Sequence, residues 1–205
     1  MGDTVNGSLA QTPQRADVLT TAIDAVRTWG SSEAAEDPHA KAVAAVAVEI
    51  AARLGVELAR CFAVAAGALL HDIGKGLLDP EILSKPGPLD EGERTHVQTH
   101  AEAGAEALPD SVPDAIRAVV RFHHERWDGR GYPHGIAAWA IPLEARIVAV
   151  ADAFQAMLED RPYRGARAEP DAVDEVLRAS GTQFDPACVQ AFAELVGSAP
   201  SRSHS

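Results

Sequence analysis

The stretch Leu70-His71-Asp72-Ile73-Gly74-Lys75 closes an apolar run that begins at Cys61 and predicts a buried helix. Packing does not explain an imidazole and a carboxylate side by side at the end of such a helix, because burying both without partners would cost several kcal/mol. Neutral His and ionised Asp are both metal ligands, and Lys75 within one turn suggests a phosphate or a leaving group nearby. The stretch therefore predicts a metal centre, to which other parts of the chain must supply further ligands.

The composition is that of a globular protein built from packed helices. Of the 205 residues, 46% are hydrophobic and only 5% are aromatic, with alanine dominant, which favours helix packing over a β-sandwich. The formal net charge of −12 argues against polymeric nucleic acid as a partner, because such binding needs a basic face. A small anionic substrate, held by metals and a few local arginines, is compatible with this charge.

Cysteines and leader signals bear on the compartment. Cys61 and Cys188 lie in apolar settings and are expected to be reduced core residues. The chain does not start with a basic segment followed by an apolar one, and no apolar stretch approaches the ~18–20 residues that a membrane span needs. We therefore expect a soluble, cytoplasmic protein without a membrane partner.

Helical periodicity organises the chain, and no segment shows the sustained alternation of a strand. In the first expected helix, 14–29, Val18, Ala22 and Val26 share one face, and the acidic connection 31–37 that follows is the best candidate boundary. Further helices are expected over residues 38–54, 57–73, 89–108, 113–125, 143–158, 170–180 and 186–196. Residues 127–142 form a long Gly/Pro loop, and a loop of this length is usually functional. The pattern predicts an all-α fold.

Seven residues are candidate metal ligands, and each has an ordinary alternative when it is taken alone. His39 would be an exposed first-turn residue, Asp152 a buried partner of an arginine, and His123-His124 a pair on a helix surface. Together these alternatives fail, because all the buried polar groups need partners and one shared cluster would satisfy them. The candidates are His39, His71, Asp72, His100, His123, His124 and Asp152.

The number and type of these ligands bear on the metal. Seven nitrogen and oxygen ligands are too many for one tetrahedral zinc. They suit two metals ~3.5–4 Å apart that share a bridging carboxylate. Ligation without thiolates suits Fe, Mn, Zn, Ni or Mg.

An ordered series of short motifs runs through most of the chain. The segments are HDIGK at 71–75, ILSKPG at 82–87, HAEAG at 100–104, HHERWDGRGYP at 123–133, IPLEARI at 141–147, AD at 151–152, DRPYR at 160–164 and GTQFDP at 181–186. From about residue 38 to 196 the sequence resembles the HD-GYP family, a branch of the HD superfamily of metal-dependent phosphohydrolases. The resemblance implies an HD-domain bundle of about seven helices around a di-metal centre. It divides the chain into a flexible lead with an N-terminal helix (1–37), the HD-GYP domain (38–197) and a disordered tail (198–205).

The activity implied by the resemblance is hydrolysis of a cyclic dinucleotide, above all cyclic di-GMP, with iron or manganese as the metals. Carried over by residue, one metal would be held by His39, His71, Asp72 and Asp152. The second metal would be held by Asp72, as the bridge, with His100, His123 and His124.

Three basic residues would act on the substrate. Lys75 would stabilise the phosphate or protonate the leaving 3′-oxygen, and Arg161 and Arg164 would bind phosphate, to which guanidinium pairs bidentately. The alternatives are that Lys75 is simply favoured by a helix dipole and that one arginine pairs with a surface carboxylate.

The loop Gly131-Tyr132-Pro133 has several interpretations. Its glycine permits a close backbone approach. Tyr132 would support the site from outside the ligands or contact a signalling-protein partner, as the resemblance implies; a rigid loop that braces the end of the His123-His124 helix is the structural alternative. A homodimer is also compatible with the sequence. His96 is expected to be exposed or to lie just outside the ligands, and His134 has no assigned role.

Two positions depart from the family pattern. Members with a third metal carry a carboxylate one turn before the first histidine, where this chain has Ala35. The family usually has a basic residue three positions after that histidine, where this chain has Ala42. The first departure favours two metals, and hence opening of the ring to linear pGpG over conversion to GMP. The second departure weakens the resemblance around His39 and with it the assignment of His39 as a ligand. Residues 1–37 are too short for a sensor domain, so we expect none there.

Two other functions remain open on the sequence. The same metals would serve an HD-class hydrolase of another nucleotide phosphoester, with only the pocket differing. A non-catalytic module that binds a nucleotide or a partner would be expected to lack ligands, and none is clearly missing.

Overall fold

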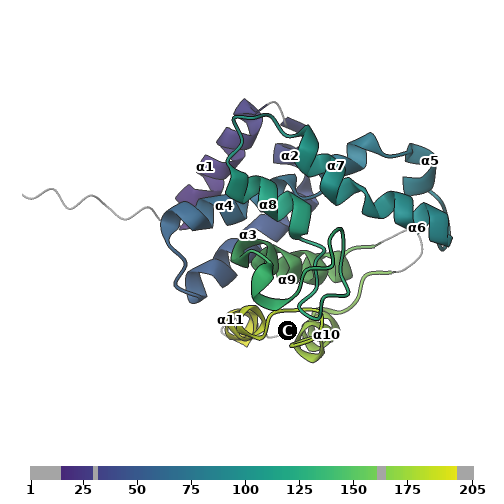
Figure 1. Cartoon of the computed structure of the whole chain (residues 1–205). Coiled ribbons are helices and arrows are strands. Elements are labelled where there is room, and N and C mark those ends of the chain that lie inside the picture. Colours follow the sequence, from purple (N-terminus) through teal and green to yellow (C-terminus); the bar gives the residue numbers. More distant parts are fainter. Residues whose placement is uncertain (1–14, 30–31, 161–164, 198–205) are drawn as a thin grey trace, which may run out of the picture.

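The apolar helix that precedes His71, α4 (Leu58–Leu70), lies at the centre of the fold, with residues 63–70 all buried. It packs against α1 (Arg15–Thr28), α3 (Pro38–Arg53), α8 (Asp114–Phe122) and α9 (Leu143–Leu158), as Figure 1 shows. Most of its buried side chains are alanine or glycine, so the neighbouring helices approach closely. The predicted ligands gather where the ends of α4 and α8, the start of α3 and the middle of α9 approach one another.

The structure is a computed structural model that describes residues 15–29, 32–160 and 165–197. The remaining elements are α2 (Ser32–Glu36), η1 (Ile73–Leu77), α5 (Pro80–Leu83), α6 (Glu91–Gln98), α7 (His100–Ala107), η2 (Ala138–Ala140), α10 (Glu169–Arg178) and α11 (Pro186–Gly197). Within the described ranges there is no strand, only one isolated bridge between Ser180 and Phe184. The all-α prediction is confirmed.

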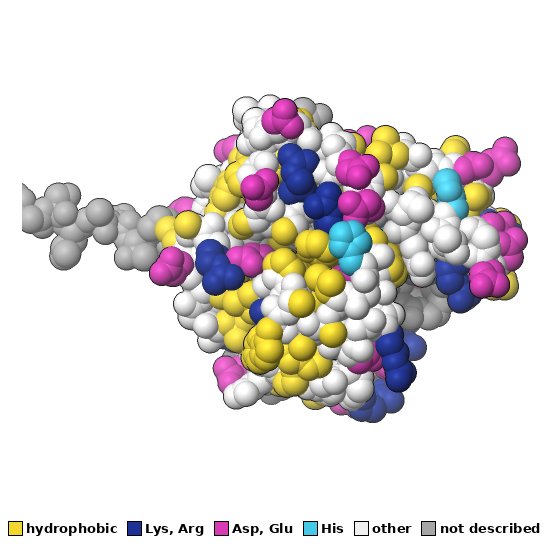
Figure 2. Space-filling view, in the orientation of Figure 1, with side chains coloured by type: hydrophobic (Ala, Val, Ile, Leu, Met, Phe, Trp, Pro, Cys, Tyr) yellow, Lys and Arg dark blue, Asp and Glu magenta, His cyan; other side chains and the backbone are white. Residues whose placement is uncertain are grey.

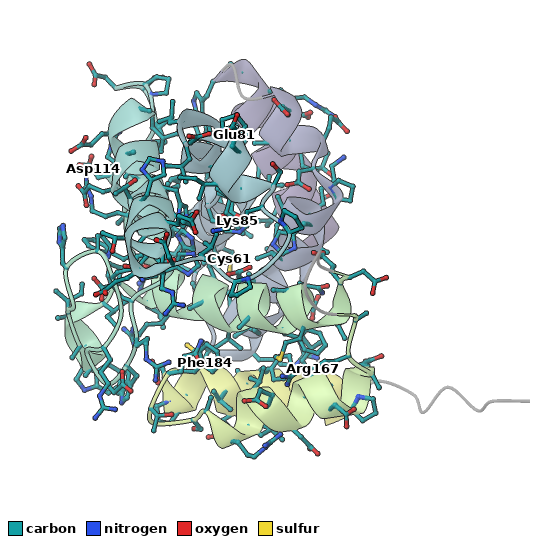
Figure 3. All side chains as sticks on the ribbon, turned by 90° about the vertical axis from the view of Figure 1, so that its right-hand side faces the viewer. Cys61, Glu81, Lys85, Asp114, Arg167 and Phe184 are labelled. Carbon is teal, nitrogen blue, oxygen red and sulfur yellow. The ribbon has the colours of Figure 1, made fainter. Side chains whose placement is uncertain are left out.

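The last two helices cover α9 on the side away from α4. α10 and α11 both pack against α9, and Figure 1 shows them side by side below it. Phe184, in the connection between them, is buried, and the amide of Arg167 donates to the carbonyl of Met157 near the end of α9. Figure 3 shows both residues between α9 and the final pair of helices. This layer holds α9, and with it Asp152, against α3 and α4.

Two segments differ in detail from the helices expected on the sequence. The connection 31–37 contains the short helix α2, whose Ala35 is fully buried. The helix expected over 89–108 is divided at Thr99 into α6 and α7. The Thr99 hydroxyl donates to the carbonyl of His96 and the ring of His100 to that of Val97, and such side-chain bonds compete with the helical ladder. The division places His100 at the first position of α7.

Three predictions from the sequence concern residues that lie partly or wholly outside the described ranges. These are the lead 1–13, the tail 198–205 and the substrate-binding pair Arg161 and Arg164. The proposed domain boundary at residue 37 stays a prediction.

Within the described ranges, no helix has the length and apolar character required to cross a bilayer. On the face that Figure 2 shows, basic side chains are scattered among acidic ones.

The contact between η1 and α7 depends on two glycines. A Cβ atom added to Gly74 would lie 2.0 Å from the carbonyl oxygen of His100 and 2.7 Å from the amide nitrogen of Gly104. Both neighbours are backbone atoms and cannot rotate away. Asp72 and His100 flank this contact. Because Gly74 and Gly104 have no side chains, η1 and α7 approach closely and bring Asp72 near His100.

We predict that Gly74→Ala destabilises the protein by about 2 kcal/mol or more, because the methyl group forces η1 and α7 apart. For a chain of this size that corresponds to a melting temperature lower by roughly 4–8 °C. Gly76→Ala is the matched control, since it lies in the same short helix and a Cβ there meets nothing within 4 Å. Thermal unfolding of the two variants tests the prediction, and equal melting temperatures would contradict it.

Candidate metal centre

Three histidines are oriented by the backbone carbonyl that lies three residues earlier in the chain. The Nδ1 atoms of His71, His100 and His123 lie 2.7, 2.7 and 2.8 Å from the carbonyl oxygens of Ala68, Val97 and Val120. A carbonyl can only accept, so each ring in its neutral form carries its proton on Nδ1 and has its lone pair on Nε2. All three side chains are about 1% exposed. Each ring is thus held in the tautomer that binds a metal through Nε2.

The Nε2 atoms converge on Asp72. The distance from His71 Nε2 to Asp72 Oδ2 is 3.3 Å, and that from His100 Nε2 to Asp72 Oδ1 is 3.4 Å. The Nε2 atoms of His100 and His123 face each other at 3.4 Å. His71 Nε2 and Asp72 Oδ1 are buried without a hydrogen-bond partner in the protein. Lone pairs that face one another in a buried site suit a cation between them, so the residues present fit a metal.

The ligand atoms form two groups that share one carboxylate. Asp72, His100, His123 and His124 form the first group, and His39, His71 and Asp72 the second. Within each group these atoms lie within 4.8 Å of one another. This division matches the expectation that Asp72 is the bridge.

Asp152 joins the second group from α9. Its Oδ1 lies 3.2 Å from His39 Nε2 and 3.7 Å from His71 Nε2. The structure therefore brings all seven predicted ligands together, and their role as ligands stays a prediction.

One residue at this centre, Glu159, was not predicted from the sequence. The Nδ1 atom of His39 lies 2.9 Å from Oε1 of Glu159, the residue that ends α9. Glu159 follows Asp152 by seven residues, which is two helical turns, so both carboxylates lie on the same face. That spacing was the available signal, but an acidic residue at a helix end is usually solvated.

Burial and the neighbouring charges shift the pKa values of the clustered histidines in opposite directions. Burial lowers the pKa of His71, but the carboxylates of Asp72 and Asp152 outweigh it and raise that pKa to about 9. Burial, with the nearby His100, lowers the pKa of His124 to about 3. Burial likewise lowers the pKa values of His100 and His123. Without metal, one proton thus resides on His71, and the histidines on the other side of Asp72 are neutral.

Of the three residues predicted to act on the substrate, Lys75 lies within the described ranges. The Nζ atom of Lys75 lies 2.6 Å from Asp72 Oδ2, and its side chain is 40% exposed. A cavity of about 860 Å³ opens beside them and is lined by residues that include Asp72, Lys75 and Asp37. A smaller cavity of about 260 Å³ lies on the other side, lined by residues that include His124, Tyr132 and Asp152.

The loop that contains Gly131-Tyr132-Pro133 braces the end of α8. A Cβ at Gly131 would lie 2.4 Å from the amide nitrogen of Arg126, so only glycine fits. The Tyr132 ring lies 4.7 Å from the His124 ring, centroid to centroid, and its amide donates to the His124 carbonyl at 3.3 Å. These contacts agree with the interpretation as a brace and leave a partner contact untested.

Three further side chains near the site have partners or exposure of their own. Glu125, which is buried, accepts the amide of His134 at 2.7 Å through Oε1. His134 also reaches Glu102, with 3.1 Å between Nε2 and Oε2. His96, for which exposure was one expectation, is near the surface, and its Nε2 accepts the amide of Asp79 at 3.4 Å.

Sequence comparisons give the family. The profile of the HD domain family matches residues 17–188. The cyclic di-GMP phosphodiesterase response regulator RpfG of Xanthomonas campestris pv. campestris is 42% identical over 151 residues, which are 72% of this chain and 40% of that protein. The 3′3′-cGAMP-specific phosphodiesterase 1 of Vibrio cholerae is 40% identical over 132 residues, which are 62% of this chain and 30% of that protein. The chain thus spans less than half the length of these two relatives.

Comparison of structures agrees on the fold. An HDGYP protein from Bdellovibrio bacteriovorus superposes with a TM-score of 0.65 over 90% of this chain and 65% of its own length, at 16% identity. The chain therefore belongs to the HD domain family. The profile match and the relatives named as cyclic di-GMP phosphodiesterases, together with the motifs, confirm the family that the sequence predicted.

The opposite pKa shifts predict a stability maximum for the metal-free protein near pH ~6.5. The raised pKa of His71 stabilises fully below pH ~6.5, and this contribution is lost as the pH rises through about 9. The lowered pKa of His124 acts in the opposite sense, because below pH ~6.5 the unfolded chain binds a proton that the folded chain excludes. Urea unfolding of chelator-treated protein should show an alkaline loss on the order of 1–3 kcal/mol.

The control for this prediction is His71→Gln, which should show a smaller alkaline loss, with the remainder due to the raised pKa of His39 beside Asp152 and Glu159, and should keep the acid loss. A flat stability profile for the unmutated protein between about pH 6.5 and 9.5 would contradict the prediction.

Proposed function

We propose that this chain is a metal-dependent phosphodiesterase that opens a cyclic dinucleotide, cyclic di-GMP foremost, to the linear dinucleotide pGpG. The observation that carries the proposal is the pair of ligand groups that share Asp72, beside Lys75 and a cavity of about 860 Å³. The substrate class is supported by relatives from Xanthomonas campestris and Thermotoga maritima, 42% and 36% identical, that are named cyclic di-GMP phosphodiesterases.

The chemistry needs a cation centre, and the residues present are suited to one. When bound, two divalent metals would activate water and neutralise charge on the phosphate oxygens. Iron or manganese is proposed, with Zn, Ni and Mg as the other metals that this ligand set suits. Asp72 bridges the two sites in this proposal, while the backbone-held rings of His71, His100 and His123 fix their geometry.

The protein side chains handle the substrate. Hydrolysis adds water to phosphorus and breaks the bond to the 3′-oxygen, which must then gain a proton. Lys75 stands at the mouth of the centre, where its ammonium group stabilises the phosphate or donates that proton. Arg161 and Arg164, outside the described residues, are proposed to bind phosphate bidentately.

The surroundings of His39 support two metals over three. Ala35, at the position of the expected third-metal carboxylate, is fully buried. The neighbouring acids are already engaged: Glu36 accepts from Arg27 and Lys41, which lower its pKa to about 2, and Asp37 accepts the amide of His39. This environment favours the linear dinucleotide as the product over GMP.

A second substrate has specific support. The relative from Vibrio cholerae that is 40% identical is named a 3′3′-cGAMP-specific phosphodiesterase, so cyclic GMP-AMP is the alternative cyclic dinucleotide. We further propose a cytoplasmic location, a signalling partner at the Gly131-Tyr132-Pro133 loop and a homodimer.

The proposal is tested by incubating Mn²⁺- or Fe²⁺-loaded protein, prepared anaerobically, with cyclic di-GMP, 3′3′-cGAMP and a mononucleotide. We expect pGpG from cyclic di-GMP, identified by chromatography, and two metals per chain by elemental analysis. Asp72→Ala should lose both metals and all turnover, because it removes the bridge.

The control is Asp114→Ala, an exposed aspartate at the far end of α8 from His123. Retention of both metals in Asp72→Ala would refute the bridging assignment. Lack of turnover in fully loaded protein would instead favour a binding module.

Lys75→Ala should keep both metals and lower kcat by roughly 10²–10⁴, if the ammonium group acts as the general acid. Lys85→Ala is a matched control, because that lysine is similarly exposed, 38% against 40%, and pairs with Glu93 instead. Loss of metal in Lys75→Ala would show that Lys75 serves Asp72 rather than the substrate.

A further inference from the structure

His39 is held differently from the three histidines that use their own backbone. It is the second residue of α3, and its Nδ1 atom bonds to a side chain rather than to a backbone carbonyl three residues earlier. Its Nδ1 atom instead lies 2.9 Å from the carboxylate of Glu159, which is 120 residues later in the chain. The direction of its ring therefore depends on a side chain from another helix.

We propose that Glu159 is a positioning residue for the metal centre, which fixes His39 with Nε2 directed at Asp152 and His71. The proposal rests on the role of His39 as a ligand, proposed above. Glu159 itself faces Nδ1 and not the cluster, so it acts through His39.

The physical argument starts from the proton on the ring. A carboxylate can only accept, and each nitrogen of His39 faces one, Nδ1 facing Glu159 at 2.9 Å and Nε2 facing Asp152 at 3.2 Å. With a metal at the centre, Asp152 would serve that metal, so the proton of neutral His39 would stay on Nδ1 against Glu159 and the Nε2 lone pair would be directed toward the centre. A carboxylate on the far nitrogen also makes the imidazole a stronger donor to a metal. Loss of such partners typically costs 10–100-fold in metal affinity. The contact between Glu159 and His39 is therefore expected to strengthen the binding of a metal by His39.

The effect should be confined to one of the two sites. His39 shares its ligand group with His71 and Asp72, whereas His100, His123 and His124 form the other group. Among the described residues, Glu159 forms its hydrogen bond with His39 and none with the latter group, two of whose rings are held by backbone carbonyls. A change at Glu159 should weaken one metal site and leave the other intact, which general misfolding would not do.

Glu159 also borders the segment proposed to bind the substrate. The next residue, Asp160, accepts the amide of Ala166 at 2.8 Å and so ties the two sides of that segment together. A substitution at 159 could act through this segment rather than through His39. Asp160→Ala separates the two routes, because it disturbs the segment without touching the imidazole.

The experiment is a titration of the chelator-treated full chain with Mn²⁺, followed by the EPR signal of free Mn²⁺. We expect two sites in the unmutated protein. In Glu159→Ala, one site should weaken by about 10–100-fold and the other should keep its affinity. Glu159→Gln keeps an oxygen acceptor for Nδ1–H and should recover most of the loss, and Asp160→Ala should bind Mn²⁺ as the unmutated protein does.

A double-mutant cycle assigns the effect to His39. His39→Ala should weaken the same site, and adding Glu159→Ala to it should change Mn²⁺ affinity no further. Additive losses, an equal loss in Asp160→Ala or unchanged Mn²⁺ affinity in Glu159→Ala would each overturn the inference. An unmutated chain that binds no Mn²⁺ would overturn the metal assignment on which it rests. Circular dichroism checks that each variant is folded, which is expected because the Glu159 side chain is 41% exposed.

Discussion

The centre of the fold buries polar atoms of His71 and Asp72 that the protein does not satisfy internally. His71 Nε2 and Asp72 Oδ1 have no protein hydrogen-bond partner, and the Nε2 atoms of His100 and His123 face each other. Such an arrangement is costly in an apolar interior and is favourable only with a cation. The hydrophobic energy of the helices around α4 therefore holds together a cluster that would otherwise separate.

The packing around α4 makes that convergence possible. Its buried face is built from alanine and glycine, and Gly67 and Gly74 face neighbours so near that an added Cβ would clash. Large side chains here would widen the spacing between helices and with it the distances among the ligands. The same small residues that gave the sequence its alanine-rich composition thus set the dimensions of the centre.

The sequence predicted the helices and the seven clustered residues because both leave local signals. A polar pair such as His71-Asp72 at the end of an apolar helix has no local explanation, so it points to partners elsewhere. Glu159 escaped notice because its role exists only where α9 meets α3. The break at Thr99 also escaped notice, since it arises from side-chain bonds within an otherwise regular helical pattern. Features created by tertiary contact or by competition for a carbonyl are thus the ones that a pattern misses.

The backbone bonds to His71, His100 and His123 have a consequence for how the sequence can drift. Every amino acid carries a carbonyl group, so positions 68, 97 and 120 can orient these rings whatever their side chains are. Evolution is then free to choose Ala68, Val97 and Val120 for packing alone. The orientation of three of the seven predicted ligands is thus set by the backbone, and neutral substitutions can accumulate around them without misaligning a ligand.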